Sequence, residues 1–259
     1  MSSSLLMAFL YAAPFHLSLP QGAANELIVL RWLHITAGII WIGLLYFFNL
    51  VGFPTMKRLE GPVRVKLFAE MMPRAMGWFR WSALVTVVMG LRYFWVLLAA
   101  DARNEGDPVL VFKWFGEWVF IWLVAFALIY PLQLPAKGAR NNPFVRVIGI
   151  GAISFAAAWL TLYRNASPQS SNAHLAISVG GGLGLLMLLN TWGVVWRAQK
   201  KLIAFASVAA EQATPMPPEA DRLTRWVFLT ARTGFWMSFP MLFLMGAAEH
   251  YPFLGGILN

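Results

Sequence analysis

The most regular feature of the chain is a series of six long apolar stretches separated by shorter polar segments. They cover residues 27–51, 81–100, 109–134, 144–163, 175–196 and 226–248. Each is close to the roughly 20 residues that a helix needs to cross the hydrocarbon core of a bilayer. None has the residue-by-residue alternation that is typical of a membrane barrel strand. The pattern predicts an all-α fold, a polytopic membrane helix bundle with six transmembrane helices.

Two segments outside these stretches carry predictions of their own. The apolar run within residues 1–24 is too short to span and is interrupted by Pro14 and Pro20. We expect a signal-like or interfacial segment there, followed by a single transmembrane domain over residues 25–259. Between the first two stretches, apolar residues recur at near-helical spacing among basic ones, which predicts an amphipathic helix on the inner membrane surface at about residues 62–74. The alternative is a solvated linker with one helical turn.

Charge fixes the expected orientation. The chain is 59% hydrophobic and only 12% charged, with a net charge of +9. Fourteen Lys and Arg residues fall in three alternate connections, at residues 54–80, 135–146 and 197–225, whereas the connections at 101–108 and 164–173 hold one each. Because basic residues gather on the cytoplasmic side, both termini are predicted on the non-cytoplasmic side of a bacterial inner membrane. This placement accounts for the positive charge, so we expect lipid and no nucleic acid as a partner.

Three of the four histidines fall at one end of three different stretches. His34, His174 and His250 lie about 23 to 25 positions from the basic residue at the other end of the same stretch. At 1.5 Å per residue, all three are expected about 35 Å above the inner boundary, near the outer interface. Each alone is typical of an interfacial residue that satisfies its own hydrogen bonds. Together they predict a cofactor site built from facing helices.

The residue types favour haem b as that cofactor. Cysteine is absent, which removes thiolate metal sites, iron–sulfur clusters and covalent c-type haem. Imidazole binds haem iron as a neutral nitrogen donor, and no paired carboxylates suit a di-iron centre. Gly38 and Trp41 follow His34, and a glycine run that includes Gly181 follows His174, so a flat macrocycle has small and aromatic residues beside it. Close helix packing explains the same glycines equally well.

Two charged residues within the spans are candidates for chemistry. Arg92 and Glu117 are expected at the same depth, nine positions before Asp101 and ten after Asp107. Charged side chains inside a membrane are costly and are commonly functional. The pair could bond to each other. Alternatively, Arg92 neutralises a haem propionate or binds substrate, and Glu117 handles protons.

Three segments resemble the membrane domain of the membrane-bound urate hydroxylase (urate oxidase N-terminal) family. The first runs from Leu30 to Gly43, LRWLHITAGIIWIG. The second joins His174, the glycine run and Asn190-Thr-Trp to Gln199-Lys-Lys, and the third runs from Ala231 through Pro240 to His250-Tyr-Pro-Phe. They occur in the family's order over most of residues 27–253.

The resemblance implies a domain that helps to oxidise a reduced substrate, classically urate, and delivers electrons toward a c-type cytochrome. The family's membrane domain is commonly followed by a cytochrome c domain, which this cysteine-free chain lacks, so a stand-alone form with a separate acceptor subunit is expected. That subunit is a periplasmic c-type cytochrome or part of a larger respiratory or photosynthetic complex.

The first functional hypothesis is therefore a haem-b electron-transfer protein. Its iron is bound by two of the three histidines, with His34 and His174 favoured and His250 as the substitute. Two axial imidazoles favour pure electron transfer, and one leaves a position open for substrate. The alternatives are a urate oxidoreductase proper and a cofactor-free accessory subunit of a larger membrane complex.

Overall fold

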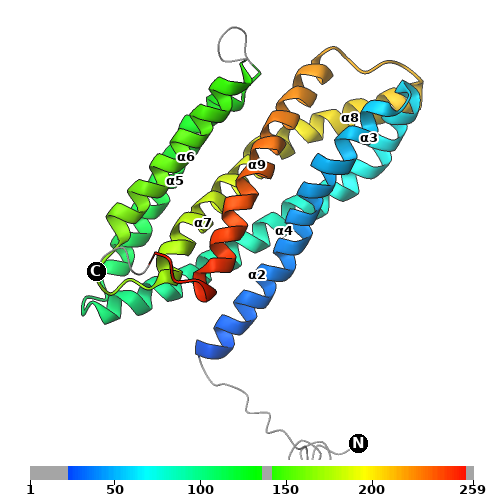
Figure 1. The fold of residues 1–259 in the computed structure, drawn as a ribbon. Coiled ribbons are helices and arrows are strands. Elements are labelled where there is room, and N and C mark those ends of the chain that lie inside the picture. Colours follow the sequence, from blue (N-terminus) through cyan, green and yellow to red (C-terminus); the bar gives the residue numbers. More distant parts are fainter. Residues whose placement is uncertain (1–22, 136–141, 255–259) are drawn as a thin grey trace, which may run out of the picture.

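The computed structural model describes residues 23–135 and 142–254, and helices account for nearly all of them (Figure 1). The elements are α2 (Ala23–Tyr46), η1 (Phe47–Gly52), α3 (Phe53–Arg58), α4 (Gly61–Asn104), α5 (Leu110–Gln133), α6 (Pro143–Asn165), α7 (Asn172–Asn190), η3 (Thr191–Val195), α8 (Trp196–Gln212) and α9 (Glu219–His250). Six helical segments are long and apolar enough to cross a membrane, as predicted. The expected signal-like or interfacial segment lies almost entirely outside the described residues.

The six spans run alternately up and down, so their ends gather at two opposite ends of the bundle (Figure 1). We call one the histidine end. It holds the start of α2, α5 and α7 and the finish of α4, α6 and α9. We call the other the basic end. It holds α3, the start of α4, α6 and α9, and the finish of α5 and α8.

Two helices are much longer than a bilayer requires. The 44 residues of α4 correspond to about 66 Å, whereas the hydrocarbon core is about 30 Å thick. Residues 62–74 are helical, as predicted, but they form the first part of α4 and not a separate helix. Likewise, α7, η3 and α8 form one helical segment from Asn172 to Gln212. Helix therefore continues past the apolar stretches and enlarges the basic end.

Local sequence explains where the helical segments stop at the basic end. Leu59 is extended between α3 and α4, and Pro62 begins α4 where its missing N–H needs no partner. Ala213 closes α8 with a positive φ of 52°. The proline-rich segment after it separates α8 from α9, as predicted.

Packing is closest where glycine replaces side chains. The α7 helix packs against α9, and α4 packs against α2. A Cβ atom placed on Gly182 would lie 1.8 Å from Cε2 of Trp122 on α5, and one on Gly180 would lie 3.0 Å from Cβ of Leu244 on α9. The glycine run of α7 is therefore used for close helix packing. Conversely, α6 leaves most of its apolar side chains exposed, Phe155 among them, as expected for a surface in contact with lipid.

Candidate functional site

A cavity of about 570 Å³ opens between α2, α4, α7 and α9 in the half of the bundle toward the histidine end. Its volume lies within the roughly 300–1,000 Å³ of small-molecule sites. Five of the six residues predicted to bind a cofactor line it: His34, Gly38, Trp41, Gly181 and His250. The sixth, His174, is not among its lining residues.

The ring of His34 is held against α4. Its Nδ1 atom lies 2.7 Å from the carbonyl oxygen of Thr86. Because a carbonyl only accepts, Nδ1 must carry the proton and donate it, which leaves the lone pair on Nε2. The ring also lies on Gly90, where a Cβ atom would approach its Cε1 and Nδ1 to 2.9 Å. The backbone of α4 thus fixes both the tautomer and the position of an imidazole that lines the cavity.

His174 sits in a different environment, fully buried and joined to Asp101. Its Nδ1 lies 3.0 Å from Oδ2 of Asp101, and that carboxylate oxygen also accepts from N and Oγ of Ser171, each at 2.9 Å. Trp114 packs beside the imidazole with ring centroids 5.2 Å apart, and Phe94 lies at 6.2 Å. Nε2 of His174 is buried without a hydrogen-bond partner.

The expectation of one depth for all histidines does not hold for His174. On α4, His34 contacts Thr86 and Gly90, whereas His174 bonds to Asp101. Eleven residues of helix separate Gly90 from Asp101, a rise of about 16 Å. The structure therefore brings His34 to one cavity with His250, and not with the favoured partner His174. Asp101 had been assigned to a loop because the apolar stretch ends at Ala100, but α4 continues through it to Asn104.

A polar cluster at the rim of the cavity was not anticipated. Arg31 Nη2 donates to the hydroxyl of Tyr93 at 2.6 Å, and that hydroxyl donates to Oε1 of Glu249 at 2.7 Å. Arg31 also forms an ion pair with Glu249. All three residues line the cavity, beside His250. No spacing rule connects positions 31, 93 and 249, so the cluster could not be predicted from the sequence.

The expected pair between Arg92 and Glu117 is wrong. Arg92 Nε donates to Oε1 of Glu26 on α2 at 2.6 Å, and Glu117 Oε2 accepts from Nε of Arg164 on α6 at 3.1 Å. Both ion pairs are at least partly exposed, and neither Arg92 nor Glu117 is among the residues that line the cavity. Equal depth did not bring them together because they point from α4 and α5 toward different neighbouring helices.

The donor set fits a macrocycle better than a bare metal ion. Among the described residues, no group of three or more His, Cys, Asp or Glu side chains is arranged to hold a metal ion. Haem supplies its own four equatorial nitrogens and needs only one or two imidazoles. His34, with its pinned tautomer and glycine-lined surroundings, meets that need. No protein-family model, curated protein or solved structure matches the chain, so the resemblance to the urate hydroxylase membrane domain stays a prediction.

Proposed function

We propose that this chain is a b-type cytochrome-like electron-transfer protein of the bacterial inner membrane, with haem b in the cavity that His34 and His250 share. The observation that supports it is the state of His34, whose Nδ1 is fixed by the Thr86 carbonyl at 2.7 Å. A ligating histidine typically donates its other ring N–H to such a carbonyl, which orients the ring and raises its basicity.

The lining residues have distinct roles in this proposal. His34 would hold the iron through Nε2, and His250 would be the second imidazole available in the same cavity. Gly38 and Gly181 present no side chain, so a flat ring can approach the helices that carry them, whereas Gly90 makes room for the His34 ring itself. At the rim, Arg31 is the cation available to the propionates, and Tyr93 and Glu249 hold its side chain in place. When bound, haem supplies one-electron transfer.

The charge distribution supports a direction for electron transfer. Of the fourteen Lys and Arg residues in the three basic connections, the twelve that the structure describes lie toward the basic end. Lys137 and Arg140 fall outside the described residues. By the positive-inside rule the basic end faces the cytoplasm, which puts both termini and the cavity with His34 toward the periplasm. Electrons from a reduced substrate or dehydrogenase would then leave to a periplasmic c-type cytochrome or to a larger respiratory or photosynthetic complex.

The test is a reduced-minus-oxidised optical spectrum of the protein purified from membranes. We expect a b-type haem spectrum that is lost in His34→Leu and weakened or shifted in His250→Leu. A carbon monoxide shift in the wild type would indicate one axial histidine, and its absence would indicate two. No pigment in the wild type, or an unchanged spectrum in His34→Leu, would overturn the proposal. Absence of pigment together with co-purified subunits would favour the accessory-subunit alternative.

A second measurement distinguishes the urate oxidoreductase alternative from the proposed electron-transfer protein. Because Arg92 and Glu117 are held in ion pairs away from the cavity, we expect Arg92→Ala and Glu117→Ala to leave the haem spectrum and its rate of reduction unchanged. Urate-dependent reduction of the haem that disappears in either variant would favour the oxidoreductase.

A further inference from the structure

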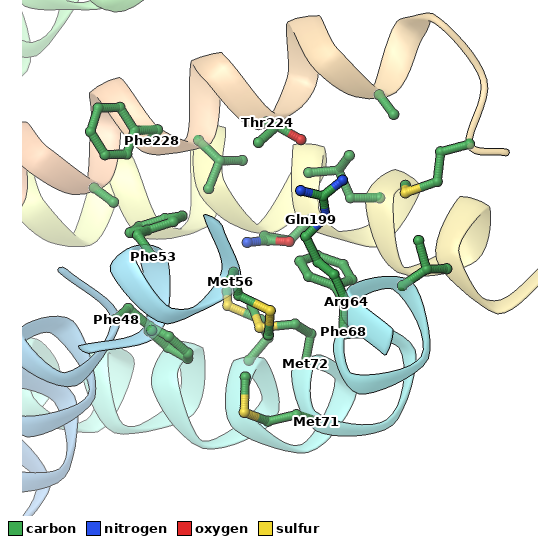
Figure 2. Close-up of a pocket in the computed structure, with 18 of the residues that line it drawn as sticks. Phe48, Phe53, Met56, Arg64, Phe68, Met71, Met72, Gln199, Thr224 and Phe228 are labelled. Carbon is green, nitrogen blue, oxygen red and sulfur yellow. The ribbon is translucent and has the colours of Figure 1, made fainter. Parts of the chain in front are cut away.

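A second cavity lies at the basic end, away from the candidate haem site. Its volume is about 990 Å³, and it is enclosed by α3, the start of α4, α8 and the start of α9. Figure 2 shows Phe48, Phe53, Met56 and Met72 gathered near Gln199 in this space. The two cavities share one lining residue, Trp41. None of the lining residues has a role in the proposed function.

Three buried neutral polar side chains of this cavity have atoms without hydrogen-bond partners. Asn190, Gln199 and Thr230 are 3%, 4% and 1% exposed. Both side-chain atoms of Asn190, Oε1 of Gln199 and Oγ1 of Thr230 have no hydrogen-bond partner, and neither does Nε1 of Trp41. A buried polar atom without a partner costs roughly 1–3 kcal/mol. Several such atoms around one cavity are therefore groups to which a bound ligand could supply the partners.

The backbone is irregular at the same place. The described chain has two π-helical segments, η1 and η3, and both contribute lining residues: Phe48 and Gly52 from the first, Thr191 and Val195 from the second. A π-helical turn inside an α-helix is rare, costs regular hydrogen bonds and commonly occurs at functional sites. Two of them on separate spans, facing one cavity, are an observation independent of the unpartnered side chains.

The residues that line this cavity indicate which class of ligand it could bind. The charged residues of the lining are exposed, whereas Asn190, Gln199 and Thr230 are buried and neutral. Buried neutral polar side chains suit a neutral polar group on the inner part of a ligand better than a charged one. The rest of the wall is aromatic and rich in methionine, which adapts to flexible apolar groups: Met56, Met71, Met72, Met76, Met187 and Met216. The ligand is thus a neutral polar head on an apolar body.

We propose that this cavity binds a quinone, with its ring near Asn190, Gln199 and Thr230 and its apolar tail along the methionine-rich wall. The unpartnered atoms include donors (Nδ2 of Asn190 and Nε1 of Trp41), acceptors (Oδ1 of Asn190 and Oε1 of Gln199) and a hydroxyl that does both. Quinone carbonyls accept hydrogen bonds and hydroquinone hydroxyls also donate them. The mixed set accommodates both forms, whereas a lipid ester offers acceptors only.

The experiment titrates the purified protein with decylubiquinone by calorimetry, after extraction of bound lipids and their identification by mass spectrometry. We expect a co-purified quinone and saturable binding of the probe. Asn190→Leu and the near-isosteric Gln199→Met should each weaken binding about 3- to 10-fold, since each removes hydrogen bonds to the ring. Asn49→Leu is the matched control: it is a buried amide in η1 that bonds to the Leu45 carbonyl at 2.9 Å and does not line the cavity.

Three results would overturn the proposal. They are no binding to the wild type, equal weakening in Asn49→Leu, and a phospholipid recovered from the protein that decylubiquinone does not displace. His34→Leu separates this proposal from the previous one, because that variant should lose pigment and bind the probe as the wild type does. If Asn190→Leu fails to fold, Gln199→Met alone decides the outcome.

Discussion

The two ends of the bundle differ in how most of their polar groups are partnered, although Nε2 of His174 at the histidine end also lacks a partner. Near the histidine end, Asp101 ties α4 to α7 through His174 and Ser171, and Arg31 ties α2 to α4 and α9. Near the basic end, the cavity wall holds Asn190, Gln199 and Thr230 with atoms that bond to nothing in the chain. Polar atoms that bond to each other join helices, whereas polar atoms left open are free to bond to a ligand. The difference predicts opposite effects of substitution at the two ends.

The largest effect is expected from Asp101→Ala. Oδ2 of Asp101 accepts hydrogen bonds from the backbone N–H and the hydroxyl of Ser171 and contacts the ring of His174, which is fully buried. Removing it leaves these groups unpaired and should lower the free energy of unfolding by about 3 kcal/mol. Thermal unfolding followed by tryptophan fluorescence measures the change. Asp101→Asn keeps one acceptor and should lose less. Equal unfolding temperatures for wild type and Asp101→Ala would show that this group does not join the helices.

Gly90→Ala tests whether the position of the His34 ring in the cavity matters for stability and for haem binding. A Cβ atom at position 90 would lie 2.9 Å from the His34 ring, so the ring must move or lose its bond to Thr86. We expect a cost of about 1–3 kcal/mol from overpacking, and a weaker or shifted haem spectrum. Gly77→Ala, also on α4, is the control, because no atom lies within 4 Å of its added Cβ and Gly77 lines neither cavity. A Gly90→Ala spectrum identical to that of Gly77→Ala would contradict the role of His34.

Substitution of an unpartnered polar residue at the basic end should raise the free energy of unfolding, whereas the substitutions at the histidine end lower it. The Asn190 amide has two polar atoms without a partner. In ligand-free protein, Asn190→Leu exchanges this amide for an apolar side chain of similar size. We expect the free energy of unfolding to rise by about 1 kcal/mol, since the desolvation penalty is removed. Thermal unfolding of ligand-free protein measures it. A clear loss of stability would mean that Asn190 has structural partners, and the contrast between the two ends would fail.

Sequence alone predicted the spans well because their length and apolarity follow from the bilayer. It missed the extent of α4 and α8, since a helix that leaves the membrane becomes polar without ending, and for this reason Asp101 was assigned to a loop. It placed residues by depth but not by rotation about the helix axis. Arg92 and Glu117 therefore lie in separate ion pairs. Five of six predicted cofactor residues do share a cavity. His34, Gly38 and Trp41 do so because they are spaced four and three residues apart on α2 and therefore share one face of it.

The smallest effect is expected from the exposed ion pair between Arg92 and Glu26. Their side chains are 50% and 41% exposed, although Nε of Arg92 and Oε1 of Glu26 lie only 2.6 Å apart. Water and salt screen such a pair, so Arg92→Ala should change the free energy of unfolding by about 0.5 kcal/mol or less. Unfolding measured at low and high salt should bring the variant and the wild type together as salt rises. A loss comparable to that of Asp101→Ala would mean that this pair also joins helices, and that burial does not distinguish the bonds that hold the histidine end.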